Sequence, residues 1–433
     1  MRLSRAAFPA GRLAAGLAVL VLAGCASQPA ATPPAAPPPS PAVPAAPPAP
    51  SQAPPPQAAP ADGFAAWVAA FRAEARGAGI GEATLQAALD PAQYLPRVVE
   101  LDRAQPEFTR AVWDYLDTAV SDARVARGQE QLARVRPQAD AAAARYGVPA
   151  EVLAAIWGME SNYGSNYGST PTVDALATLA FDGRRADWAR KELLAALRIL
   201  DQRDIDVAHM IGSWAGAMGQ TQFMPSTFLG YAVDADGDGR RDIWGSMADV
   251  MASTANFMAR SGWQPGQPWG LEVRLPPGFD VARADAGVRQ DAGAWAAEGV
   301  QAASGAALPA LPDAQLLLPA GARGPAFLVG PNYRALLRYN NSTSYALGVG
   351  LLAQRLAGGA GVQAAWPRDL VPLTRSQVTA LQQALKARGF DPGEPDGMAG
   401  PATRRALRDW QRSAGLPADG FPTADLLQRL QQP

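Results

Sequence analysis

The chain has 433 residues, which is enough for two or three domains, and 48% of them are hydrophobic, which is enough to bury a sizeable core. Its 40 Pro and 42 Gly predict much non-regular backbone, and its formal net charge of −1 comes without a block of Lys or Arg. We therefore expect no nucleic-acid partner, because binding a phosphate backbone requires a basic surface.

The first residues have the pattern of an export signal. Three arginines precede an apolar run, LAAGLAVLVL (13–22), which is too short to span a bilayer, since a mature transmembrane helix needs about 20 residues. The run ends in LAGC, which looks like the lipobox of bacterial lipoproteins. Residues 1–24 are thus predicted to be a lipoprotein signal peptide, and Cys25, the only cysteine, the lipidated residue. The alternative is a buried cysteine after an ordinary signal peptide.

Residues 25–61 are predicted to be a tether. They are dominated by Pro and Ala, so they cannot form a core and should lie near polyproline II. At about 3.1 Å per residue, a stretch of some 30 residues reaches roughly 90 Å. Ala26, rather than Asp, after Cys25 favours sorting to the outer membrane. We expect a periplasmic protein, lipid-anchored at the inner leaflet of that membrane.

After Asp62 the apolar residues recur every three and four positions, which predicts a mainly α-helical body. The clearest runs are 64–71, 112–120, 192–200 and 247–258. The helical spacing is lost from about 269 to 325, where Pro, Gly and Ala runs and a candidate short strand at 271–275 predict an insertion or lobe.

A composition break at a Gly-rich GGAG segment separates the body, residues 62–365, from a small C-terminal unit, residues 366–433. Thr374 and Gln377 have the spacing of a capping box at the start of a helix. A second helix is predicted to open at Pro401, and the unit has room for three short helices. Two Asp-Gly pairs, at 396–397 and 419–420, each precede a helical stretch and suggest a weak internal repeat.

The scarcity of His and Cys excludes several catalytic classes. His209 is the only histidine, so a zinc amidase or peptidase lacks its ligands. A serine–histidine pair would have to use His209, which has no nucleophile-elbow motif nearby and is predicted to be structural or exposed. Acid–base chemistry is thereby left to carboxylates, which is the chemistry of glycosidic bonds.

Glu160 is the carboxylate that stands out. A helix is predicted to start at Pro149, and Glu160 lies seven residues after Leu153 and four after Ile156, on the same apolar face. A polar, glycine-rich segment, SNYGSNYG (161–168), follows at once and suits the wall of a cleft. Partial desolvation at such a helix end raises the pKa of a carboxyl, as a proton donor requires. The alternative is a glutamate that merely ends a helix.

Three motifs carry a family resemblance. They are IWGMESNYG (156–164), GAMGQTQFMP (216–225) and RYNNS with the following Tyr345-Ala346 (338–346). Over roughly residues 62–360 the chain resembles the membrane-bound lytic murein transglycosylase B family. The resemblance implies a lysozyme-like α-helical fold in which Glu160 is the sole catalytic acid/base. In that family this group protonates the oxygen between N-acetylmuramic acid and N-acetylglucosamine, then deprotonates the muramyl 6-hydroxyl, which closes a 1,6-anhydro ring.

The resemblance also implies the walls of the site. The residues matching positions that face the sugars are Ser213, Gln222, Tyr339, Asn340, Tyr345 and, less directly, Tyr115. Hydroxyls and amides can bond the hydroxyl and N-acetyl groups of a glycan, and tyrosine rings offer flat surfaces to pyranose faces. The alternative for each residue singly is ordinary packing or loop hydrogen bonding. No cofactor is expected for catalysis.

An acidic loop, DADGDGRRD (234–242), resembles an EF-hand calcium loop. Acids occupy its positions 1, 3, 5 and 9, and Gly239 takes the sharp-turn position 6. It departs from the pattern at position 12, where Gly245 replaces the usual Glu, and the family resemblance implies that Asp249 completes the site. A structural calcium site is expected on Asp234, Asp236, Asp238, Arg240 and Asp249. The alternative is a set of Asp-Gly turns that bind no ion.

The C-terminal motif DGMAGPAT (396–403) resembles a three-helix peptidoglycan-binding domain, the alternative being a helical spacer. The expected partners are peptidoglycan glycan strands, the membrane that holds the lipid anchor, and other cell-wall enzymes. Two other functions stay open. A hydrolytic muramidase would need a second carboxylate, for which Asp174 and Asp182 are the nearest candidates, or a held water. A non-catalytic wall anchor would merely bind glycan.

Overall fold

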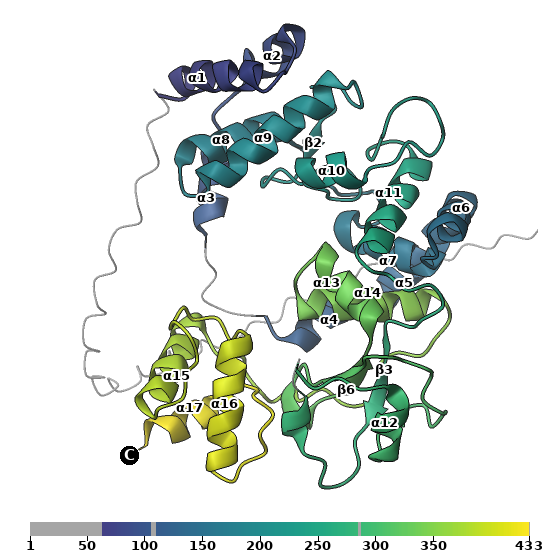
Figure 1. Cartoon of the computed structure of the whole chain (residues 1–433), viewed down its shortest axis with the longest axis vertical. Helices are drawn as coiled ribbons and strands as arrows, with labels where there is room; N and C mark the ends of the chain where they lie inside the picture. The colour runs from purple at the N-terminus through teal and green to yellow at the C-terminus, as the bar shows by residue number, and fades with distance from the viewer. Residues whose placement is uncertain (1–62, 105–109, 285–286, 433) are drawn as a thin grey trace, which may run out of the picture. The chain divides into compact units, whose positions relative to one another are not determined.

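The computed structural model describes residues 63–104, 110–284 and 287–432 (Figure 1). The signal peptide, Cys25 and the Pro/Ala tether fall outside these ranges, so those features stay predictions. Within the described ranges, no helix combines the length and the hydropathy that crossing a bilayer would demand. The described residues are mainly helical, as predicted.

Two of the first four helices, α1 (Phe64–Gly77) and α4 (Val112–Ala119), have the predicted apolar faces. The other two are α2 (Glu82–Leu89) and α3 (Pro96–Arg103). Phe71 of α1 is fully buried, and Leu116 of α4 is 6% exposed. The three- and four-residue spacing in 64–71 and 112–120 therefore predicted both helices correctly.

A larger helical core surrounds helix α7 (Ala150–Ser161). Nine of its twelve residues are buried, so it is a central helix rather than an amphipathic surface one. It packs against α5, α6, α11 and α14. This core also includes residues of α1, α2 and α4. Its other helices are α5 (Asp122–Arg134), α6 (Arg136–Tyr146), α8 (Thr172–Asp182), α9 (Ala186–Asp201), α10 (Pro225–Tyr231), α11 (Met247–Arg260), α13 (Pro331–Tyr339) and α14 (Thr343–Leu356).

A small mixed lobe interrupts the helical core, as the loss of helical spacing after residue 269 predicted. Its antiparallel sheet has the order β4-β3-β6-β5, and in it Val273 pairs with both Ala302 and Ala326. Trp295 is fully buried in the lobe's own core. The elements are β3 (Gly270–Arg274), β4 (Gln301–Ala302), β5 (Gln315–Leu317), β6 (Ala326–Val329), α12 (Ala292–Ala297) and the 3₁₀ turns Val281–Arg283 and Gly321–Arg323.

A two-stranded antiparallel sheet joins two loops of the helical core. Strand β1 (Thr170–Pro171), which follows the end of α7, pairs antiparallel with β2 (Ile211–Gly212). At Gly168 the backbone has φ +91°, and a Cβ there would lie 2.0 Å from the carbonyl oxygen of Gly212. Glycine is therefore required at this position for the two loops to approach.

The C-terminal unit is a three-helix domain with its own core. Its helices are α15 (Arg375–Ala387), α16 (Pro401–Ser413) and α17 (Ala424–Gln431). The predicted capping box of Thr374 and Gln377 is confirmed. The internal repeat is also present, because each Asp-Gly pair makes the same contact with a glutamine. The Gln382 side chain accepts from the N–H of Gly397 at 2.9 Å, and the Gln411 side chain accepts from the N–H of Gly420 at 2.8 Å.

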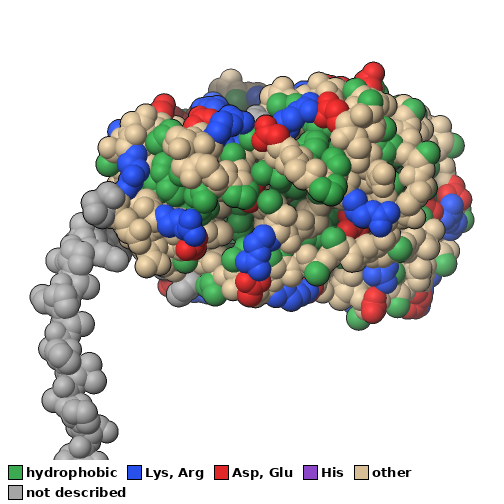
Figure 2. Space-filling model, turned by 90° about the horizontal axis from the view of Figure 1, so that it is seen from below, with side chains coloured by type: hydrophobic (Ala, Val, Ile, Leu, Met, Phe, Trp, Pro, Cys, Tyr) green, Lys and Arg blue, Asp and Glu red, His purple; other side chains and the backbone are tan. Residues whose placement is uncertain are grey.

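The surface carries mixed charge on the face that Figure 2 shows. There, Lys and Arg side chains alternate with Asp and Glu and with hydrophobic side chains. Many of the ion pairs are exposed, such as that between Arg97 and Glu100, and such pairs contribute little to stability. Stability must therefore rest mainly on the buried cores.

Candidate active site

Glu160 occupies the last turn of α7. Leu153 and Ile156 of the same face are fully buried, while Glu160 itself is partly buried. The predicted start of this helix is close to the observed one, because Pro149 is the residue just before Ala150. The glutamate thus sits where an apolar helix face meets the polar segment 161–168, as predicted.

The chain turns sharply directly after Glu160. Asn162 and Tyr163 both have left-handed backbone conformations, with φ of 49° and 59°. Asn tolerates this conformation at a helix end, but Tyr adopts it rarely. A Cβ on Gly158 would lie 2.5 Å from the Tyr163 ring, so that glycine lets the ring lie against the helix. Strained positions of this kind cluster at functional sites.

Arg124 of α5 holds this turn in place. Its guanidinium donates to the carbonyl oxygen of Gly158 at 2.6 Å, and its own carbonyl accepts from the Tyr163 hydroxyl at 3.1 Å. The bond to Gly158 satisfies a helix carbonyl near the end of α7. Sequence reasoning missed Arg124, because nothing near residue 124 indicates a contact with residues 158 and 163.

The carboxyl of Glu160 accepts a hydrogen bond from the Tyr345 hydroxyl at 2.6 Å. Burial raises the pKa of Glu160 to about 7, against the lowering effect of that hydrogen bond. The group therefore holds its proton up to neutral pH, as a general acid must. No carboxylate of the described residues contributes to this pKa shift.

Three tyrosines surround the carboxyl. The rings of Tyr339 and Tyr345 are stacked, with centroids 6.4 Å apart and planes 12° apart. Burial raises the pKa of Tyr345, Tyr339 and Tyr115, and the charge of Glu160 contributes to the rise in each. The structure therefore brings these three predicted substrate residues together around Glu160.

Ser213 and Gln222 lie on the loop that follows β2. The Ser213 hydroxyl accepts from the N–H of Ala217 at 3.1 Å, and the Gln222 amide donates to the carbonyl of Tyr167 at 2.9 Å. Tyr339 also reaches this loop, because its hydroxyl donates to the carbonyl of Thr221 at 2.7 Å. Asn340, the residue after Tyr339, is exposed. The prediction that Asn340 contacts substrate is therefore supported only by its exposure and its place next to Tyr339.

The side chains considered for other mechanisms are engaged elsewhere. Asp174 accepts from the N–H of Gln93 at 3.2 Å, and Asp182 accepts from the guanidinium of Arg103 at 2.6 Å. His209 is exposed and lies 2.8 Å from an Asp206 carboxylate oxygen. These contacts favour neither a second catalytic carboxylate nor a histidine-based mechanism.

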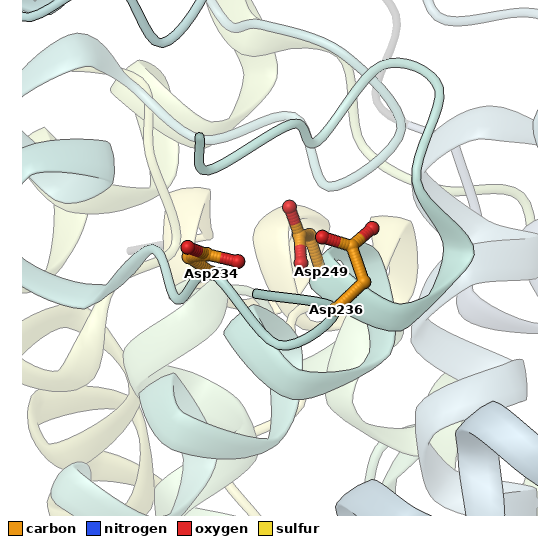
Figure 3. A group of neighbouring side chains, drawn as sticks. All are labelled: Asp234, Asp236 and Asp249. Carbon is orange, nitrogen blue, oxygen red and sulfur yellow. The ribbon is translucent and has the colours of Figure 1, made fainter. Parts of the chain in front are cut away.

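Figure 3 shows three aspartates of the acidic loop region together. Asp234 and Asp236 come from the loop and Asp249 from the first turn of α11, and one oxygen of each lies within 4.8 Å of the others. Asp238 is not in this group, and its carboxylate accepts from the N–H of Arg240 at 2.8 Å. Three of the five predicted metal-binding residues therefore have side-chain oxygens that lie close together.

Asp249 is fully buried beneath this loop. Its two carboxylate oxygens accept from the N–H groups of Ala235 and Asp242, each at 2.7 Å, and burial raises its pKa to about 6. A buried carboxylate with two acidic neighbours suits a hard divalent cation, which prefers oxygen ligands and offsets their negative charge. The residues present therefore fit a calcium-type ion.

Comparison with protein families gives two matches. The Transglycosylase SLT domain family matches residues 63–354, and the peptidoglycan binding domain family matches residues 374–430. Both matches lie inside the predicted domains, 62–365 and 366–433, although they do not test those boundaries.

Solved structures and curated sequences give similar relatives. SltB3 from Pseudomonas aeruginosa, in complex with NAG-anhNAM-pentapeptide, is 53% identical, with a TM-score of 0.83 over 85% of this chain and 99% of that one. Escherichia coli lytic transglycosylase Slt35, in complex with calcium, is 31% identical, with a TM-score of 0.58 over 67% of this chain and 92% of that one. Membrane-bound lytic murein transglycosylase B of Escherichia coli (strain K12) is 35% identical over 224 residues, which are 49% of this chain, and the chain spans 58% of that relative's length.

Proposed function

This chain belongs to the SLT transglycosylase family, and we propose on that premise that it is a lytic transglycosylase of peptidoglycan. It cleaves the β-1,4 bond between N-acetylmuramic acid and N-acetylglucosamine and leaves 1,6-anhydromuramic acid ends, in cell-wall remodelling and recycling. The observation that supports this most is the partly buried carboxyl of Glu160, which accepts from the Tyr345 hydroxyl and whose pKa burial raises to about 7 with no contribution from another carboxylate of the described residues.

Glu160 acts first as acid and then as base. Its proton passes to the glycosidic oxygen while the bond from that oxygen to the muramyl C1 breaks, and the substrate's own N-acetyl group stabilises the positive centre. The muramyl 6-hydroxyl then attacks C1 and returns its proton to Glu160, so that the carboxyl is restored and no water is consumed. Tyr345 donates to one carboxyl oxygen, and we assign the proton to the other oxygen.

The tyrosine group and the loop after β2 form the walls of the proposed glycan site. Tyr115, Tyr339 and Tyr345 offer rings and hydroxyls around Glu160, and Ser213, Gln222 and Asn340 offer polar groups to the sugars. The C-terminal three-helix domain holds the same polymer, because its family is one of peptidoglycan binding.

Mass spectrometry of the fragments released from purified sacculi tests this function. We expect muropeptides that end in 1,6-anhydromuramic acid and are lighter than the hydrated form by one water molecule. Fragments that end mainly in reducing sugars would show a hydrolytic muramidase instead. Binding without any release of fragments would show a non-catalytic wall anchor.

We further propose that a lipid on Cys25 anchors the protein at the inner leaflet of the outer membrane, where it can meet other cell-wall enzymes. Support comes from the LAGC sequence before the Pro/Ala tether. The Cys25→Ala variant is expected in the soluble periplasmic fraction, still active on isolated sacculi, because the folded domains are unchanged. A variant that stayed with the membranes after a salt wash would contradict the anchor.

Calcium is proposed as a structural ion, held by Asp234, Asp236 and Asp249 with Asp238 and Arg240 of the same loop. An ion that binds only the folded state stabilises it by about 2.7 kcal/mol at a hundredfold excess over Kd. Calcium should therefore raise the melting temperature of the chelator-treated protein. Asp234→Ala combined with Asp236→Ala should abolish the rise, whereas the surface change Glu130→Ala on α5 should preserve it. An equal response in all three proteins would contradict the site.

A further inference from the structure

Gln220 is a buried amide whose polar atoms are all paired. Its Oε1 accepts from the indole N–H of Trp157 at 2.8 Å, and its Nε2 donates to the carbonyl of Trp244 at 2.7 Å. Its backbone N–H donates to the carbonyl of Ile243 at 2.9 Å. The residue is 8% exposed, so losing either side-chain bond would leave a buried polar group without a partner.

The first of these contacts leads to the catalytic helix. Trp157 precedes Glu160 by three residues on α7, and its ring packs edge-on against Tyr163, with centroids 5.5 Å apart. Gln220 also lies against the turn after Glu160. Its Oε1 is so close to Gly164 that a Cβ on that glycine would lie 2.3 Å from it. The amide therefore contacts the helix on one side of Glu160 and the turn on the other.

The second contact leads to the acidic loop. The backbone N–H of Trp244 donates to the Asp242 carboxylate at 2.8 Å, and the N–H of Asp242 donates to Asp249 at 2.7 Å. The indole of Trp244 donates to the carbonyl of Ile211, two residues before Ser213, at 2.8 Å. Hydrogen bonds thus run without a break from the acidic loop through Gln220 to α7.

We propose that Gln220 is a positioning residue for Glu160, which fixes the last turn of α7 against the segment that leads out of the acidic loop. The proposal rests on the proposed function, because Glu160 must meet both the glycosidic oxygen and the 6-hydroxyl from one position. Misplacing a catalytic group by about 1 Å can cost on the order of a hundredfold in rate. A loosened turn would also admit water to the carboxyl and lower its pKa.

Gln220→Met tests the proposal, since it removes the amide and keeps the length of the side chain. On a short soluble glycan we expect kcat to fall by about tenfold to a hundredfold with KM little changed. On the alkaline side of the pH profile, the pH at which kcat falls to half its maximum should move down, because Glu160 would lose its proton at a lower pH. Thr178→Val is the matched control, because it removes a fully buried hydroxyl of α8 that accepts from the backbone N–H of Leu95 at 3.0 Å. An equal loss of kcat in both variants would overturn the proposal.

Hydrogen exchange gives a readout that does not depend on activity. The amides of residues 157–166 should exchange faster in Gln220→Met than in the wild type, and at the wild-type rate in Thr178→Val. If this segment exchanged at the wild-type rate in Gln220→Met, the proposal would be wrong even for an active enzyme. If the wild type cleaved no glycan, the proposed function would be wrong, whereas faster exchange in Gln220→Met would still support the contact between Gln220 and α7.

Trp157→Phe removes the other partner of the same hydrogen bond, which keeps the test available if Gln220→Met does not fold. It should change kcat and exchange in the same direction. Because one bond is broken in either case, the double variant should be no slower than the slower single variant. Losses of kcat that simply multiply would show that the two residues act independently and would contradict the proposal.

Discussion

Glu160→Gln is expected to lower the turnover of glycan strands by at least about a hundredfold, the low end of what general acid–base catalysis contributes. Glutamine keeps the size of the side chain and can still accept from the Tyr345 hydroxyl, but it cannot deliver a proton or take one back. The loss should fall on kcat, because the tyrosine group and the C-terminal domain still hold the polymer. Initial rates on soluble glycans, with binding to sacculi measured in parallel, check this prediction.

The control for this variant lies on the same helix. Glu151, in the first turn of α7, forms an ion pair with Arg136 at the surface, with Nη1 3.0 Å from its Oε1. Glu151→Gln removes the same charge from the same element and should leave turnover near the wild-type rate. Near-normal turnover in Glu160→Gln would overturn the mechanism, and equal losses in both variants would point to a general effect of charge.

The same substitution should stabilise the protein above neutral pH. Burial raises the pKa of Glu160 in the folded state to about 7, against an ordinary value of 4.5. Between these values the folded state holds a proton that the unfolded state has released, so the free energy of unfolding falls as pH rises. At 1.36 kcal/mol per pKa unit the wild type loses at most about 3 kcal/mol, and glutamine avoids this loss.

Melting curves of both proteins across pH 4 to 9, with a chelator present throughout, would reveal the effect. The gain in stability of Glu160→Gln should be small below the ordinary pKa, grow between the two pKa values and level off above the higher one. Asp249, whose pKa is also raised, titrates in both proteins and therefore cancels in the difference. A difference that did not vary with pH would contradict the raised pKa of Glu160.

The sequence by itself determined several of the helices and the place along the chain of the proposed catalytic residue. The apolar spacing before Glu160 predicted α7, and the pair Thr374 and Gln377 predicted the start of α15. Both signals are local, because a helix face repeats within four residues and a cap acts within one turn. The loss of helical spacing after residue 269 predicted the lobe, but the order of its strands depends on pairing across tens of residues.

Only the tertiary structure decided which side chains meet. Tyr345 reaches Glu160 from 185 residues away, and that contact exists because α14 packs on α7. The burial that raises the pKa of Glu160 and the bonds of Gln220 likewise depend on segments distant in the chain. Local periodicity tells which face of a helix is buried, whereas the partner of that face follows from how all the helices pack together.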